Sequence, residues 1–245
     1  MTTPPRNPKI KAVFFDFMGT CLDWHSGVLS ALPASIPPAA ASSLAITWRH
    51  TYFAANAARL AANLAPENID TTLRTTLLHV LNQPPHSEHR SLFLGEDKQD
   101  PIARCVAAFH SMPAWPDVPD AIAGLKGAGY EVFVFANGSP RLQLDLCRSS
   151  GLGFDMLFSS ELLGVYKPAR ESYERVLAFV KVRPEEAVQV AAHAYDTRGA
   201  KEVGMRTVYV RRWTDDVDED MEVVKGENDV FLEDMSGVVE AIARL

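Results

Sequence analysis

The chain contains little cysteine and no closely spaced pair of cysteines. Its three cysteines, Cys21, Cys105 and Cys147, lie far apart in the sequence. Zinc sites and dithiol redox sites need cysteines a few positions apart, so we expect neither kind of site. Few and unpaired cysteines are typical of a reducing compartment, and we therefore predict a cytoplasmic location.

A surplus of basic residues is also absent. The 245 residues include 24 Lys and Arg against 31 Asp and Glu, which gives a formal net charge of −7. General nucleic-acid binders carry a basic surplus, so we expect no nucleic-acid partner. The acidic balance still permits a small anionic substrate where local cations face it.

The sequence lacks both a signal-peptide pattern and a convincing membrane span. Residues 1–8 contain three prolines and predict a flexible tail. The stretch from Trp24 to Trp48 contains no Asp, Glu, Lys or Arg, but Pro33, Pro37 and Pro38 interrupt it. We predict two helices and a turn there, and no membrane partner.

What is present is an alternation of apolar strands and helices. Residues 11–17, KAVFFDF, predict a strand that is buried on both faces. The region from 24 to 110 shows helical patterns only, with Ser42 or Ser43 as the N-cap of a helix over 42–64. Further helices are predicted over 67–81 and over 100–112, the last with Asp100 as N-cap and Pro101 at its first position.

After residue 113 strands and helices alternate regularly, which predicts a parallel sheet with helices on both faces. The helical region is then an insertion after the first strand. The predicted strands span 130–137, 155–160, 187–192 and 206–210, and the predicted helices span 118–128, 140–151 and 171–180.

One segment, Asp215 to Glu222, contains six acidic residues. It lacks the spacing and the glycine of an EF-hand calcium loop. We therefore predict a solvated acidic loop.

Polar residues follow several of the predicted strands. Asp16 ends the first strand, Asn137 ends the second, Lys167 follows the short third strand, and His193 and Asp196 follow the fourth. In an open α/β sheet the active crevice lies at the carboxyl ends of the strands. We expect these side chains to converge at one edge.

The placements of Asp16 and Lys167 suggest that the two side chains are partners. A carboxylate inside the apolar FFDF run is costly to bury alone, and Lys167 precedes a helix whose dipole opposes a cation. Asp16 or Asp196 paired with Lys167 would explain both placements. The alternative is a buried ion pair that only ties loops together.

Four segments, FFDFMGTCLDW, FANGSP, GVYKP and VAAHAYDTRGA, together resemble the haloacid dehalogenase superfamily, and most closely its (S)-2-haloacid dehalogenase branch. The resemblance covers roughly residues 10–245. It implies an α/β fold, with a Rossmann-like three-layer core and a parallel sheet, plus an α-helical cap domain inserted after strand 1. The expected core is 1–22 and 112–245, the expected cap is 23–111, and the active site is expected between them.

The same resemblance implies roles for individual residues. Asp16 matches the nucleophile, which forms a covalent aspartyl intermediate. Lys167 matches the lysine that holds the nucleophile, and Asp196 matches the acid that places the hydrolytic water. The residues implied in substrate or halide binding are Met18, Thr20, which braces the nucleophile loop, Arg49, which receives the halide, Asn137, Gly138 and Tyr195.

Met18 separates two branches of the superfamily. The phosphatases have a second aspartate two residues after the nucleophile, which protonates the leaving alkoxide, whereas a halide leaves without a proton. Met18 cannot donate a proton, and the segment AAHAYD has a single acid, so we expect no metal and no other cofactor. Mg²⁺ is expected only if the protein is a phosphohydrolase.

The sequence departs from the usual dehalogenase pattern at four positions. The branch usually has Tyr at Met18, Ser at Ala136, Asn at His193 and Trp at Tyr195. His193 is expected to contribute to catalysis, either by donating a hydrogen bond to the substrate or as a base on the ester.

The predicted reaction is hydrolysis of a small 2-haloacid to a 2-hydroxy acid through an Asp16 ester. The alternatives are a Mg²⁺-dependent phosphohydrolase, a carbon-centred hydrolase acting on a non-halogenated metabolite, and a non-catalytic binding protein of the same fold. The predicted partner is a small anionic substrate, and the resemblance is compatible with a homodimer.

Overall fold

A six-stranded parallel sheet is built around the apolar run near the start of the chain. The computed structural model describes residues 9–65, 67–94 and 100–245; the predicted tail over 1–8 lies outside these residues. The strands lie in the order β3-β2-β1-β4-β5-β6, and every neighbouring pair is parallel, so the predicted fold class is confirmed. The strands are β1 (Ala12–Phe15), β2 (Glu131–Ala136), β3 (Met156–Ser159), β4 (Ala187–Ala191), β5 (Arg206–Val210) and β6 (Val230–Leu232).

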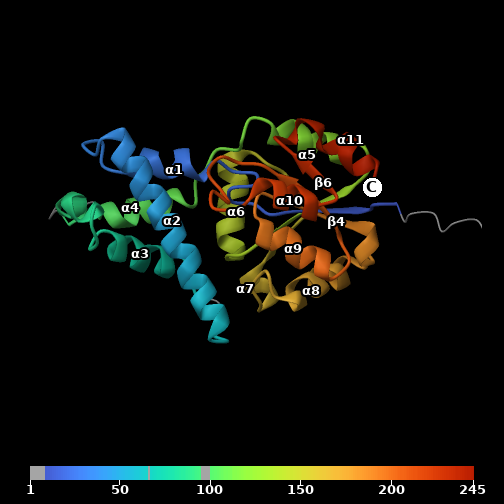
Figure 1. Cartoon of the computed structure of the whole chain (residues 1–245), viewed down its shortest axis with the longest axis horizontal. Helices are drawn as coiled ribbons and strands as arrows, with labels where there is room; N and C mark the ends of the chain where they lie inside the picture. Colours follow the sequence, from blue (N-terminus) through green and yellow to red (C-terminus); the bar gives the residue numbers. More distant parts are fainter. Residues whose placement is uncertain (1–8, 66, 95–99) are drawn as a thin grey trace, which may run out of the picture. The chain divides into compact units, whose positions relative to one another are not determined.

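The chain divides into two compact units. The first contains the described residues up to Cys21, together with Ala114–Asn137 and Leu152–Leu245, and it holds the whole sheet. Within it, α5 and α11 lie on one face of the sheet and α8 and α9 on the other (Figure 1). Its helices are α5 (Val118–Gly127), α7 (Ser160–Leu163), α8 (Arg170–Val180), α9 (Ala194–Glu202), α10 (Met221–Glu227) and α11 (Val238–Ala243), with 3₁₀ turns at η2 (Pro184–Glu186) and η3 (Met235–Gly237).

The core of this first unit explains why the β1 sequence is apolar throughout. All four residues of β1 are buried, and the strand pairs with β2 on one side and β4 on the other. Phe14 lies on one face of the sheet, and its ring centroid is 5.2 Å from that of Phe133. The ring centroids of Phe15 and Phe154 lie 6.3 Å apart. Burial on both faces requires a continuous apolar run rather than an alternating one.

The second unit is helical, as predicted for the insertion. It contains the described residues of Leu22–Pro113, together with Gly138–Gly151. None of its described residues lies in a β-strand longer than an isolated bridge, and no described helix of the chain is long and apolar enough to cross a membrane. Its elements are α1 (Trp24–Ala31), α2 (Pro38–Ala61), α3 (Ile69–Val80), η1 (His86–Phe93), α4 (Pro101–Ala108) and α6 (Pro140–Ser150).

The predicted start of the long helix is wrong, whereas the start of α4 is confirmed. α2 begins at Pro38 rather than at 42, because proline at the first helical position has its φ already fixed and loses no hydrogen bond. Ser42 therefore lies inside the helix, where its Oγ is 2.9 Å from His25 Nε2. In α4, Asp100 accepts a hydrogen bond from the Ala103 N–H, and Pro101 occupies the first helical position.

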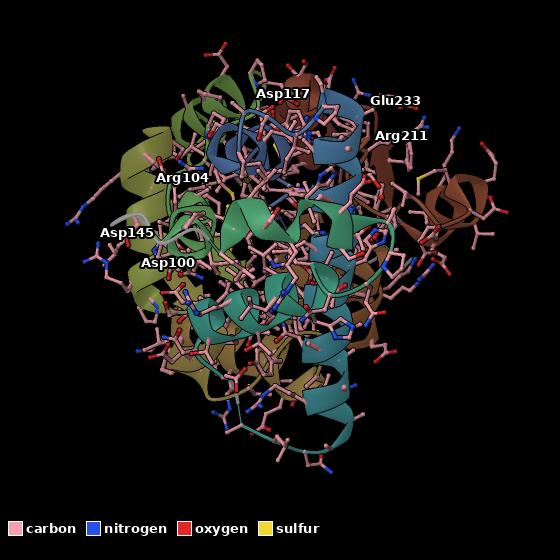
Figure 2. The ribbon with its side chains drawn as sticks, turned by 90° about the vertical axis from the view of Figure 1, so that its left-hand side faces the viewer. Asp100, Arg104, Asp117, Asp145, Arg211 and Glu233 are labelled. Atoms are coloured by element: carbon pink, nitrogen blue, oxygen red, sulfur yellow. The ribbon has the colours of Figure 1, made fainter. Side chains whose placement is uncertain are left out.

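The last part of the first unit contains elements that the sequence did not predict. β6 extends the sheet beside β5, and α10, α11 and the short α7 were not predicted; nor was η1 in the second unit. Beyond the ends of β5 and β6, Arg211 Nη1 and Glu233 Oε2 lie 3.4 Å apart (Figure 2). β6 has only three residues, all half-buried, and such a short segment lacks a clear periodicity.

Polar contacts of His110 connect α6 to the rest of the helical unit. His110 Nδ1 lies 2.9 Å from Asp145 Oδ2 on α6, and His110 Nε2 lies 2.9 Å from Asp70 Oδ1 on α3. The prediction placed residues 138–151 in the core, and the exact domain limits stay a prediction. His110 thus joins three segments of the second unit.

This arrangement predicts a pH-dependent contribution to stability. Burial lowers the pKa of His110, but its hydrogen bonds to Asp70 and Asp145 outweigh that effect and raise the pKa above its usual value. His110 therefore contributes its full share to the free energy of unfolding below its unfolded-state pKa of about 6.5. That contribution is lost as the pH rises through the folded-state pKa of His110. We expect His110→Gln to lower the free energy of unfolding by about 1 kcal/mol at pH 6, and by less at pH 9.

Urea unfolding at the two pH values measures this difference. His50→Gln is the matched control, because His50 is exposed on α2 of the same unit. An equal loss of stability at pH 6 and pH 9 would show that protonated His110 does not hold the three segments.

Candidate active site

Two of the predicted site residues, Asp16 and His193, lie at the point where the strand order reverses. From β1 the chain adds β2 and β3 on one side, and β4, β5 and β6 on the other. Asp16 follows β1 and His193 follows β4, so both lie beside this reversal, at the carboxyl ends of adjacent strands. Ligand sites of open α/β sheets form at such positions.

Asp16 is buried and accepts three side-chain hydrogen bonds. Its Oδ2 accepts from Thr20 Oγ1 at 2.7 Å and faces His193 Nδ1 at 3.1 Å, and its Oδ1 accepts from Lys167 Nζ at 3.1 Å. Thr20 Oγ1 in turn accepts from the Ala192 N–H at 2.9 Å. The threonine therefore connects the loop after β1 to the end of β4, consistent with the bracing role that the resemblance implies.

Lys167 joins the two predicted catalytic carboxylates. Its Nζ donates to Asp16 Oδ1, to Asp196 Oδ2 at 2.5 Å and to the Phe135 carbonyl at 2.7 Å. The Lys167 and Asp196 side chains are completely buried. The predicted pairing of Lys167 with a strand-end carboxylate is thus confirmed, and both carboxylates take part.

Two partners of Asp196 were not recognised in the sequence. Tyr173 OH donates to Asp196 Oδ1 at 2.7 Å, and Gln189 Nε2 donates to Asp196 Oδ2 at 3.0 Å. The Tyr173 ring fits against Gly199, where a Cβ would lie 2.7 Å from the phenol oxygen. The available signal was Gln189, an amide in the middle of a buried strand, because such a group needs a hydrogen-bond partner.

The charges of the cluster follow from these contacts. Burial raises the pKa of Asp16, but the Lys167 ammonium and the His193 ring outweigh it, so the pKa of Asp16 lies well below its usual range. Burial lowers the pKa of Lys167, yet the Asp16 and Asp196 carboxylates raise it above its usual value. An ionised carboxylate beside a charged lysine is therefore the state at neutral pH.

His193 lies between the carboxylates of Asp16 and Asp215, and Asp215 was predicted to lie in a solvated loop. Its Nε2 is 3.0 Å from Asp215 Oδ1, and Asp215 is buried. The predicted solvated acidic loop is therefore wrong for Asp215, and also for Asp216, which accepts from the Ala194 N–H. High local charge suggested exposure, but the loop after β5 folds back to the strand ends.

The charge state of His193 bears on its two predicted roles, which both stay predictions. Burial lowers its pKa, but the hydrogen bonds to Asp16 and Asp215 raise the pKa of His193 to about 10. The protonated ring has no free lone pair. His193 in this arrangement does not fit the role of a base.

Gly19 shows how closely this loop approaches the site. Its φ is +91°, which favours glycine, and a Cβ at this position would lie 2.7 Å from Asp215 Oδ1. Its carbonyl accepts from Trp115 Nε1 at 2.8 Å, and the next carbonyl, of Thr20, accepts from Arg212 Nε at 3.2 Å. These contacts fix the backbone that carries the neighbouring Thr20 hydroxyl.

Asn137 acts on the Lys167 backbone. Its Nδ2 donates to the Lys167 carbonyl at 3.0 Å, and its Oδ1 accepts from the Lys167 N–H at 2.9 Å. Met18 lies on the same loop as Thr20 and is half-buried, and the Tyr195 ring lies 5.6 Å from that of His193. The substrate-binding roles of these three residues stay predictions.

Arg49 and Gly138 belong to the second unit, and their site roles also stay predictions. Arg49 is buried, with only 3% of it exposed, so it is not a surface arginine. Its guanidinium carbon lies 4.7 Å from the Trp24 ring centroid and 4.8 Å from that of Phe53. This cation is held between aromatic faces, which stabilises it without neutralising its charge.

Comparison with known proteins agrees with this geometry. Residues 10–204 match the family model of the haloacid dehalogenase-like hydrolases. The (S)-2-haloacid dehalogenase 4A of Burkholderia cepacia is 28% identical over 212 residues, which cover 83% of this chain and 84% of that protein. The glyceraldehyde 3-phosphate phosphatase of Pyrococcus furiosus is 30% identical, but over 118 residues that cover 45% of this chain and 49% of that protein.

A solved structure extends the similarity to the fold. The L-2-haloacid dehalogenase of Xanthobacter autotrophicus superposes with a TM-score of 0.76, covering 95% of this chain and 98% of that one at 23% identity. At this identity the superposition supports the fold alone. The dehalogenase of Burkholderia is matched over most of its length, and the phosphatase over about half of its length.

Proposed function

Because this chain belongs to the haloacid dehalogenase-like hydrolases, we propose that it hydrolyses a small 2-haloacid through an ester of Asp16. The observation that carries the proposal is the set of groups around the Asp16 carboxylate. The carboxylate is ionised and buried, and its Oδ1 accepts from Lys167 alone among the residues that the structure describes. An oxygen with one free lone pair, placed beside a strand-order reversal, is suited to attack carbon.

The proposed reaction has two steps. Asp16 attacks C2 from the side opposite the halogen, and the halide leaves with the bonding electron pair. Water then attacks the ester carbonyl carbon of Asp16, and a 2-hydroxy acid is released. Only the first step breaks a bond at C2, so the configuration at C2 is inverted.

The alternative Mg²⁺-dependent phosphohydrolase fits these residues less well. Mg²⁺ needs oxygen ligands, but Asp16 Oδ2 already faces Thr20 and the protonated His193 ring. The residue two positions after the nucleophile is Met18, which can neither bind the ion nor protonate a leaving alkoxide. We therefore propose a metal-independent reaction. The cytoplasmic location and the homodimer stay predictions.

Halide release from a panel of 2-haloacids, measured with EDTA present, tests the proposal. We expect release from at least one member and a product of inverted configuration. A single turnover in ¹⁸O-water is expected to put the label into Asp16, and not into the hydroxy acid. Label appearing directly in the product would contradict the ester mechanism. Phosphate release that requires added Mg²⁺, without any halide release, would favour the phosphohydrolase.

A further inference from the structure

The two oxygens of the Asp16 carboxylate are in different environments. Oδ2 faces two donors, Thr20 Oγ1 at 2.7 Å and His193 Nδ1 at 3.1 Å, whereas Oδ1 accepts from Lys167 Nζ at 3.1 Å. A carboxylate oxygen accepts about two hydrogen bonds. Oδ2 is therefore saturated, and Oδ1 keeps one lone pair for reaction.

The donor on His193 is fixed in place by a second carboxylate. His193 Nε2 lies 3.0 Å from Asp215 Oδ1, and Asp215 Oδ2 accepts from Thr214 Oγ1 at 2.7 Å. Both ring nitrogens face carboxylate oxygens, and only the imidazolium ion can donate from both. The side chains of His193 and Asp215 are 5% and 2% exposed, so water competes little for these bonds.

We propose, on the basis of the function inferred above, that Oδ1 is the attacking atom of Asp16 and that Thr20 and the His193 imidazolium form an oxyanion site for Oδ2. Asp215 is then a positioning residue, which acts through His193. Lys167, which donates to Oδ1, is placed beside the oxygen that must leave in the second step.

The electron and proton balance is as follows. In the first step, Oδ1 forms a bond to C2 while the C2–halogen pair leaves with the halide. In the second step, water adds to Cγ and the Cγ–Oδ2 π pair moves onto Oδ2. The pair returns as the Cγ–Oδ1 bond breaks. One proton from water ends on Oδ1 of the hydroxy acid, and the other passes to solvent when Asp16 ionises again.

These donors affect the two steps in opposite ways. In the first step the negative charge on the carboxylate is lost, so donors to Oδ2 lose part of their interaction. In the second step a full negative charge develops on Oδ2, and the same donors gain. Interactions that are stronger in the transition state accelerate a step, so His193 and Thr20 accelerate ester hydrolysis rather than its formation.

His193→Leu separates the two steps. We expect a rapid burst of about one halide per active site, followed by turnover that is slower by about 10²–10³-fold, the usual cost of losing one oxyanion donor. Mass spectrometry of the intact protein, quenched during turnover of a 2-chloro acid, should show the ester accumulating. Asp215→Asn should show a smaller effect of the same kind.

Conservative variants distinguish a catalytic from a structural role. His193→Gln keeps a neutral donor and should restore part of the hydrolysis rate. Thr20→Val removes the other donor to Oδ2, whereas Thr20→Ser retains it, so this pair tests the same oxygen even if the His193 variants fold poorly. Circular dichroism and thermal unfolding check the folding of each variant.

The outcomes separate this inference from the proposed function. Loss of activity in His193→Leu and Thr20→Val without a halide burst and without bound ester, while the wild type releases halide, would overturn the oxyanion assignment alone. Absence of halide release by the wild type would overturn the proposed function itself. Accumulated ester in both variants, and little in Thr20→Ser, is the expected result.

Discussion

Replacing Asp16 by asparagine is expected to reduce halide release by about 10⁴-fold or more, because the amide oxygen is a poor nucleophile and no ester can form. The amide has the shape of the carboxylate but lacks its charge. Its NH₂ group must face either Lys167 or the donors from Thr20 and His193. Halide release and intact-protein mass, measured together, test both the rate and the intermediate.

The matched control is Asp120→Asn, since Asp120 is an exposed carboxylate on α5. It should leave halide release unchanged. If Asp16→Asn kept more than a tenth of the wild-type rate over a period too short for its deamidation, Asp16 would not be the nucleophile.

Replacing Lys167 by methionine should affect both stability and activity. Methionine has nearly the length of lysine but no charge, so Asp16 and Asp196 would face each other in the buried cluster without a cation between them. Breaking a buried ion pair by removing one partner costs about 3–5 kcal/mol. We also expect halide release to fall by about 10³-fold, because the donor to the leaving Oδ1 is lost.

Urea unfolding and halide release test these effects. Lys225→Met is the control, because Lys225 is an exposed lysine on α10. A second substitution, Asp196→Asn in the Lys167→Met background, should recover part of the stability because it removes one of the two buried charges. It should not recover activity. An exposed ion pair contributes at most about 1 kcal/mol. If Lys167→Met lowered the free energy of unfolding by less than this, the cluster would not be an ionic network shielded from water.

Much of the fold could be predicted from two local signals. The continuous apolar run of β1 indicated a strand buried on both faces, and the alternation of strands and helices after residue 113 indicated a parallel sheet. The short elements α7 and β6 could not be predicted, because three or four residues carry no measurable periodicity. The start of α2 was misplaced because a serine cap was favoured over the proline before it.

The site was predictable where a polar residue ends a strand, and less so elsewhere. Asp16, Lys167, His193 and Asp196 all follow strands and are brought together. Asp215 was missed, because its partner His193 is distant in sequence and its neighbours are acidic. A run of acidic residues in the sequence does not indicate which of their side chains is buried.

The position of β1 in the sheet has a consequence for biosynthesis. β1 is translated before every other strand, yet it pairs with β2 at Glu131 and with β4 at Ala187, more than a hundred residues later. At about 5–20 residues per second, the ribosome needs on the order of 10 s to supply the first partner. Throughout that interval β1, the strand that Asp16 follows, is an unpaired apolar segment. The nascent chain therefore needs this segment to be protected from aggregation until its partner strands have been made.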